Sequence, residues 1–131
     1  MARTLYDPDV APDGRAWLAL PELERIRLAQ NYHIAARLKI PGMKAHAALH
    51  AAVENQIATG YGPSKRAVRR LQSEGLSRHD AIHAIASVIA TFIHELREER
   101  SEDEQATFQS RMGAAIERLH ADAWLSGEGN G

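Results

Sequence analysis

The sequence predicts an all-α protein, a compact bundle of about five helices, on three observations. The chain has 131 residues, enough for one domain with a hydrophobic core of its own. Hydrophobic residues make up 44% of it and aromatic residues only 5%, and much of the apolar content is alanine, leucine and isoleucine. Alanine and leucine are strong helix formers. Runs of β-branched residues bounded by turn signals, which are typical of strands, are missing from the sequence.

Three segments are expected along the chain. Pro8 and Pro12 make residues 1–20 an irregular N-terminal arm, whose tyrosine and tryptophan pack onto the rest of the protein. A helical metal-binding domain follows over residues 21–125, on the evidence of the histidines described below. Residues 126–131 are rich in glycine and are expected to form a flexible tail.

Prolines and glycines set the bounds of the first three predicted helices. Pro21 suits the first turn of a helix, because the N–H that proline lacks has no helical partner there. The first helix is predicted to end before Pro41, and the second to run from about Pro41 to Thr59. The third is predicted from Pro63 to Gly75, where glycine fits the left-handed position that closes a Schellman motif.

Capping signals mark the last two predicted helices. Ser77 caps a fourth helix, with Asp80 three residues later in a capping-box arrangement, and this helix runs to about Glu99. Ser101, with Glu104 three residues on, begins a fifth and long amphipathic helix. The apolar side of this C-terminal helix either packs within the bundle or forms the face of a homodimer.

Charge and residue type exclude several functions. The chain has 16 basic and 17 acidic residues and a formal net charge of -1, so binding to nucleic acid is not expected. Without cysteine, a metal would be held by imidazole, carboxylate or water. No apolar run approaches the ~18 residues of a membrane span, and the start of the chain lacks the layout of a signal peptide. We therefore expect a cytoplasmic protein with no membrane contact.

The most informative pattern is a pair of histidine stripes, His46-x3-His50-x3-Glu54 on the second predicted helix and His79-x3-His83 on the fourth. Residues four apart share one helix face at about 6 Å, and here that face is also the apolar one. Burying several polar side chains is costly unless each finds a partner, and one divalent metal satisfies several at once. Imidazole and carboxylate suit Zn or Fe, with Mn or Ni as further candidates. The alternative is a set of core histidines bonded to the backbone or to one another.

The relative direction of these two helices leaves two ligand sets open. If they run parallel, His46 pairs with His79 and His50 with His83, which gives a four-histidine site. If they run antiparallel, His50 faces His83 and Glu54 faces His79, which leaves His46 to a second ion or to the surroundings of the site. Both arrangements include His50 and His83.

The segments HAALHAAVENQ over residues 46–56 and RHDAIHA over residues 78–84 follow the pattern H-x3-H-x3-E and then H-x-A-x-H. This pattern resembles a bacterial family of unknown function, the one numbered 1841, over about half the chain. In this sequence Asn55 separates the glutamate from the glutamine that follows it in the family, and His33 matches an earlier histidine. The resemblance implies a helical bundle with a metal centre, and it implies no reaction.

Two main hypotheses of function follow. In the first, the protein is a small metalloenzyme acting on a small-molecule substrate, through hydrolysis by metal-activated water or through metal-bound oxygen chemistry. Glu54 would then be both a ligand candidate and the catalytic general base. In the second, the metal is structural and the domain is a binding or regulatory module. A lesser alternative is an HD-like metal phosphohydrolase, because His79 and Asp80 form an HD dipeptide, although Asp80 has a simpler role as a helix cap.

A basic cluster on the third predicted helix offers a binding alternative. Such a cluster can bind phosphate or nucleic acid, but it is more often a solvated face, here opposed by acids near the end of the fourth helix. The cluster consists of Lys65, Arg66, Arg69 and Arg70, and the acids are Glu98, Glu99, Glu102 and Asp103. The roles of His33 and His94 stay open.

Overall fold

The computed structural model describes residues 6–35, 43–98, 102 and 107–124, and these segments are helical with no strands. The helices are α1 (Gly14–Ala19), α2 (Glu22–Ala35), α3 (Met43–Ala58), α4 (Gly62–Ser73), α5 (Arg78–Glu98), α7 (Phe108–Glu117) and α8 (Ala121–Ala123). The all-α prediction is confirmed, and five of these helices have seven residues or more. Among the described helices, none has both the length and the apolar content that crossing a bilayer requires.

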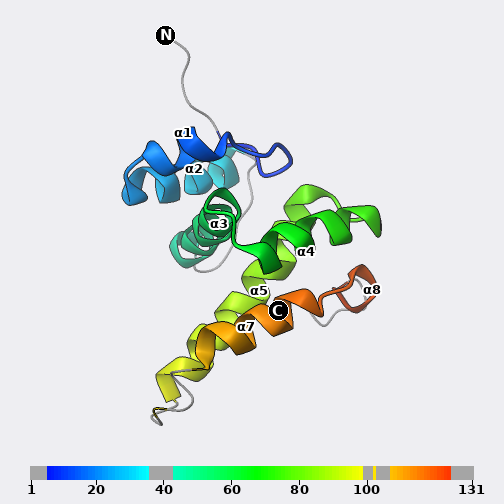
Figure 1. Ribbon diagram of the computed structural model, residues 1–131. Coiled ribbons are helices and arrows are strands. Elements are labelled where there is room, and N and C mark those ends of the chain that lie inside the picture. Colours follow the sequence, from blue (N-terminus) through cyan, green and yellow to red (C-terminus); the bar gives the residue numbers. More distant parts are fainter. Residues whose placement is uncertain (1–5, 36–42, 99–101, 103–106, 125–131) are drawn as a thin grey trace.

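The helix α3 lies between two layers of the bundle. Figure 1 shows α1 and α2 together on one side of α3, and α5 on the other side with α4 and α7 packed along it. One apolar cluster joins residues 6–29 to α3, and it includes Trp17 and Ala51. The main cluster joins α3, α4, α5 and α7 through residues such as Val53 and Ile85. The interface between α3 and α5 therefore forms part of the main cluster.

The expected irregular arm contains a short helix, α1. Asp13 caps it, because its Oδ1 accepts hydrogen bonds from the backbone N–H groups of Arg15 at 3.0 Å and Ala16 at 3.4 Å. Trp17 is buried, and its Nε1 donates to Asn55 Oδ1 at 2.9 Å. A six-residue helix held by one cap and one buried side chain has too little periodicity to be seen in the sequence. The expected packing of Tyr6 and Trp17 onto the body is confirmed.

The junction between α4 and α5 has the predicted geometry. Gly75 has φ 107, and its N–H donates to the Gln72 carbonyl at 3.0 Å. The Leu76 N–H donates to the Leu71 carbonyl at 3.0 Å, which completes the Schellman motif. The Asp80 N–H donates to Ser77 Oγ at 3.0 Å, as expected of a helix cap. This junction sets where the histidines of α5 begin.

The predicted fifth helix is two helices, and its expected start at Ser101 and Glu104 lies outside the described residues. After α7 ends, the Arg70 guanidinium donates to the carbonyls of Ile116 and Leu119 at 2.9 Å each. Residues 118–120 between α7 and α8 are not helical, so the prediction of a single long helix was wrong. The apolar side of α7 faces the main core, where its methionine and isoleucine are buried. The expected flexible tail, 126–131, also falls outside the described residues.

Candidate metal centre

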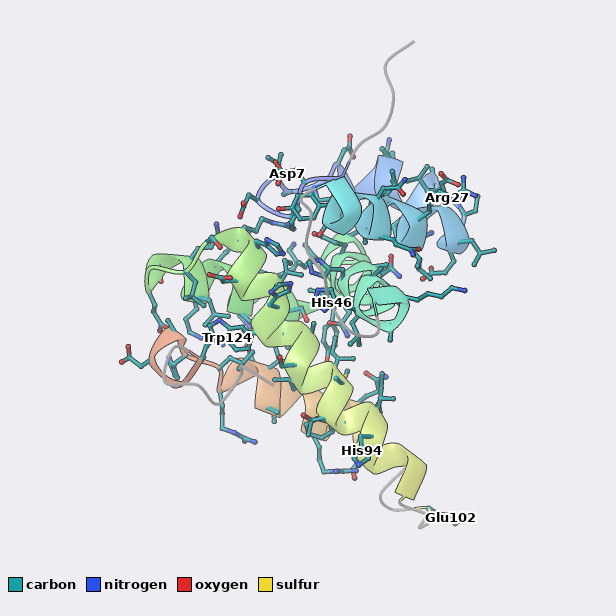
Figure 2. The ribbon with its side chains drawn as sticks, turned by 180° about the vertical axis from the view of Figure 1, so that it is seen from behind. Asp7, Arg27, His46, His94, Glu102 and Trp124 are labelled. Atoms are coloured by element: carbon teal, nitrogen blue, oxygen red, sulfur yellow. The ribbon has the colours of Figure 1, made fainter. Side chains whose placement is uncertain are left out.

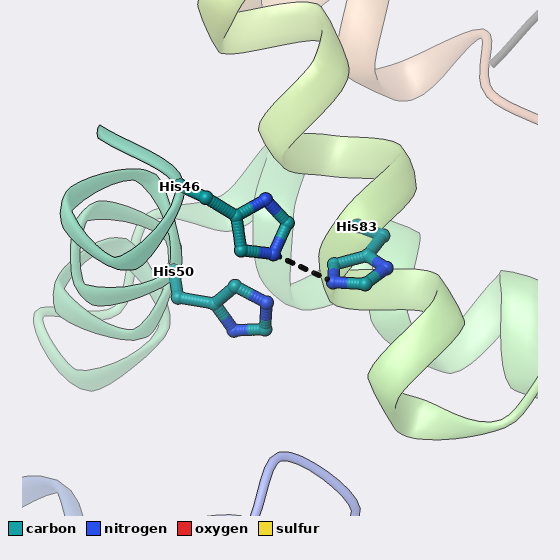
Figure 3. Close-up of side chains that lie close together, drawn as sticks. All are labelled: His46, His50 and His83. Carbon is teal, nitrogen blue, oxygen red and sulfur yellow. Dashed lines mark hydrogen bonds between the residues drawn. The ribbon is translucent and has the colours of Figure 1, made fainter. Parts of the chain in front are cut away.

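Four histidines come together where α3 and α5 face each other. Nε2 of His83 lies 3.1 Å from Nε2 of His46 and 3.1 Å from Nε2 of His79. The ring centre of His50 lies 4.8 Å from that of His83 and 5.4 Å from that of His79. Figure 3 shows His46 and His50 projecting from α3 toward His83 on α5. The two stripes of the sequence therefore form one group, with His83 at its centre.

The order of these contacts answers the question of helix direction. His46, near the start of α3, contacts His83, whereas Glu54, two turns later, contacts Arg78 at the start of α5. Rising residue numbers on α3 thus meet falling numbers on α5, so the helices run antiparallel. As in the antiparallel alternative, His50 faces His83, with ring centres 4.8 Å apart. Unlike in that alternative, His46 also contacts His83, and Glu54 meets Arg78 instead of His79.

Three of the histidines could hold one metal ion. His46, His50 and His83 each offer a ring nitrogen, and these nitrogens all lie within 4.8 Å of one another. Two nitrogens bound tetrahedrally to one zinc ion, each at about 2.0–2.1 Å, lie about 3.3–3.4 Å apart. The Nε2 separations of 3.1 Å around His83 are close to that spacing. His50 is fully buried, and His46 and His83 are half-buried, so the group lies at the edge of the core.

Aromatic rings from α2 and from the segment before α1 cover the group. The ring of Tyr32 meets that of His79 edge to face, with centres 5.4 Å apart. The ring of Tyr6 meets that of His50 in the same way, with centres 6.1 Å apart. These contacts limit how far the two imidazoles can turn.

Glu54 lies in a separate buried network beside the histidines. Its side chain is 1% exposed, and Arg78 donates to Oε1 at 2.7 Å and to Oε2 at 2.8 Å. The Tyr6 hydroxyl also donates to Oε2, at 2.6 Å, and lies 3.3 Å from Nδ1 of His50. Arg78 donates further to the Pro8 carbonyl at 2.9 Å. The carboxylate of Glu54 is thus shared between a guanidinium and a phenol.

Burial and charge shift the pKa values of Tyr6 and Arg78 in this network. Burial, and then the negative charge of Glu54, raise the pKa of Tyr6 far above its ordinary value, so its hydroxyl remains an O–H donor. For Arg78, burial works against the charged form, and the hydrogen bonds and charge of Glu54 outweigh it, so its pKa rises above the usual value. A charged Arg78 and a neutral Tyr6 are consistent with their short contacts to Glu54.

Sequence reasoning did not assign Tyr6 and Arg78 to the site. Arg78 directly precedes His79, and its place in the first turn of α5 gives no sign of burial. The position of Glu54 on the same apolar face as the histidines was the only sign in the sequence of such a partner. A buried carboxylate needs a cation nearby, and Arg78 is that cation.

The remaining predicted residues lie away from the group. Asp80 is exposed and serves the cap, and it is not among the residues that could hold the metal. His94 is exposed further along α5 (Figure 2), beside an apolar groove of about 410 Å³ between α3 and α5. The side chain of His33 lies outside the described residues.

The basic cluster of α4 is partly used within the fold. Arg66 forms an ion pair with Glu117 at 2.8 Å, and Arg70 binds the carbonyls at the end of α7. Lys65 and Arg69 are exposed. Of the acids expected to oppose the cluster, the side chain of Glu102 alone is described, and it is exposed.

Comparison of the chain with family models, curated proteins and solved structures gave no match.

Proposed function

We propose that the protein is a small metalloprotein that binds one divalent metal, Zn or Fe, through His46, His50 and His83. The ligands would be neutral imidazoles, which suit these ions, and no thiolate is available in a chain without cysteine. Mn and Ni stay as further candidates.

The contacts of His83 support this proposal most strongly. A neutral imidazole nitrogen carries either one N–H or one lone pair in the ring plane, so it makes one well-directed hydrogen bond. Nε2 of His83 nevertheless lies 3.1 Å from two other ring nitrogens, those of His46 and His79. A single hydrogen bond at Nε2 of His83 can account for only one of these two close contacts. A metal ion placed among the three nitrogens would accept one lone pair from each ring and would account for both.

We favour a metalloenzyme as the role of this metal. Three protein ligands leave a fourth position for water, which is the usual arrangement of catalytic zinc. Two of the three ligand residues are half-buried, which places the group at the edge of the core. A metal held by these three histidines would supply an activated water for hydrolysis of a small-molecule substrate. Arg78 and Tyr6 occupy both oxygens of Glu54. These contacts support a role in positioning the ligands better than a role as the general base.

A structural metal is the second candidate, and the position of His79 favours it. Its Nε2 lies 3.1 Å from that of His83, which is close to the spacing of two ligands on one ion. With His79 as fourth ligand the site would be closed, as in structural zinc centres.

Metal analysis of five purified proteins tests the proposal. We expect about one metal per chain in the wild type and loss of the metal in His50→Ala and His83→Ala, since each variant removes a central ligand. His94→Ala is the matched control, because it removes an exposed histidine from the same helix. A wild type that remains metal-free after supply of Zn²⁺ and Fe²⁺ would overturn the proposal. His79→Ala separates the two roles: retained metal favours an open site, and lost metal together with a large fall in thermal stability favours the structural one.

A further inference from the structure

We propose that Arg78, Glu54 and Tyr6 act as positioning residues for His50, by holding its Nδ1 as an N–H donor so that Nε2 presents a lone pair to the metal. This inference rests on the proposed metal-binding function and names the residues that prepare one of its ligands. It assigns a role to a buried network that lies outside the group of candidate ligands.

The first step is the direction of the hydrogen bonds. A tyrosine hydroxyl has a single hydrogen to donate. The Tyr6 oxygen lies 2.6 Å from Glu54 Oε2, the short distance typical of a hydroxyl donating to a carboxylate. Two oxygens this close need a hydrogen between them, and a carboxylate has none to give. The hydrogen of Tyr6 therefore points to Glu54.

The second step fixes the tautomer of His50. Because the Tyr6 hydrogen is used at Glu54, the contact of 3.3 Å with Nδ1 of His50 requires the ring to donate. A neutral imidazole with its hydrogen on Nδ1 carries its lone pair on Nε2. That Nε2 atom is fully buried. The network thus selects the tautomer in which Nε2 is the nitrogen able to bind a metal.

The third step concerns the rigidity of the network. Arg78 grips both oxygens of Glu54 and also the Pro8 carbonyl, which ties the segment carrying Tyr6 to the start of α5. The carboxylate, the phenol and the ring of His50 are therefore held by contacts from three separate parts of the chain. Metal-binding histidines commonly donate their other N–H to a carboxylate, which fixes the ring and strengthens the ligand. Here a tyrosine stands between carboxylate and imidazole.

Zinc titration of the full chain tests the inference, with Tyr6→Phe as the variant. This change removes the hydroxyl and keeps the ring that packs on Trp17 and His50. Loss of such a partner typically weakens metal binding by about 10–100-fold, and we expect a weakening in that range. Tyr61→Phe is the matched control, since it makes the same change in the main core, and we expect its zinc affinity to equal that of the wild type.

Nitrogen NMR of the imidazoles supplies a readout that a purely structural role would not move. We expect the metal-free wild type to carry the His50 hydrogen on Nδ1, and Tyr6→Phe to shift the ring toward a mixture of tautomers. A His50 hydrogen on Nε2 in the metal-free wild type would overturn the inference. Zinc binding that is equally tight in Tyr6→Phe and the wild type would overturn it too, and would leave the proposed function standing. Failure of the wild type to bind zinc would overturn the proposed function, and the inference with it.

Discussion

The ion pair between Arg78 and Glu54 is the residue-scale feature with the largest expected effect on stability. Both side chains are buried, 6% and 1% exposed. Removing one partner leaves a buried charge without compensation, which costs about 3–5 kcal/mol. We therefore expect Arg78→Met to lower the free energy of unfolding by about this amount, measured by urea unfolding with a chelator present. The exposed Arg69→Met should leave stability nearly unchanged.

A double variant separates the pair from its surroundings. When Arg78→Met is combined with Glu54→Met, no buried charge is left, so the double variant should be more stable than Arg78→Met alone. If the losses of unfolding free energy in the two single variants simply add in the double variant, the two side chains are not coupled. That result would contradict the interpretation of Arg78 and Glu54 as a buried ion pair.

The histidines could be predicted from the sequence, whereas the buried network of Tyr6, Glu54 and Arg78 could not, for a physical reason. His46 and His50 are four residues apart on one helix, and such spacing is a local property that a sequence displays directly. The contacts of Tyr6 with Glu54 and of Arg78 with Glu54 span 48 and 24 residues. Contacts of that range depend on how helices pack, which residue spacing does not specify.

At the scale of the element, Glu74 joins the end of α4 to the start of α8. Its carboxylate accepts the Ala121 N–H at 2.7 Å and contacts Nδ1 of His120 at 2.9 Å. The bond from Ala121, and then that from His120, lower the pKa of Glu74 below its ordinary value of 4.5. The contribution of Glu74 to stability is therefore present above the unfolded-state pKa and is lost as the pH falls through the lower folded-state pKa.

Glu74→Gln should remove this pH-dependent contribution. We expect the wild type to be more stable than the variant at neutral pH, and the difference to shrink as the pH falls below about 4.5. Urea unfolding over a series of pH values measures it, with the exposed Glu102→Gln as control. A difference that stays constant with pH would show that the carboxylate charge has no part in holding α8.

The ends of α4 and α7 show which helix ends could be predicted from the sequence and which could not. The end of α4 was predictable because Gly75 and the residues around it form a local motif. The break after α7 was not, because the contacts of Arg70 with the carbonyls there come from 46 and 49 residues away. Local signals fix caps and turns, and tertiary contacts decide whether an amphipathic run stays one helix.

At the scale of the whole molecule, the antiparallel passage of α3 past α5 creates the candidate centre. The sequence predicted both helices and their inward histidines, and it left their direction open. Packing of α3 between the N-terminal layer and the rest of the bundle settles that direction and places His83 between His46 and His79. The histidine pair of α3 and the histidine pair of α5 therefore form one group of ring nitrogens.

X-ray absorption at the zinc edge of the zinc-loaded protein tests the central claim most directly. We expect a first shell of nitrogen at about 2.0–2.1 Å, with the multiple scattering of three or four imidazoles. In His83→Ala the imidazole scattering should fall or the zinc should be lost, whereas His94→Ala should give the wild-type spectrum. A wild-type shell of oxygen without imidazole scattering would contradict the account.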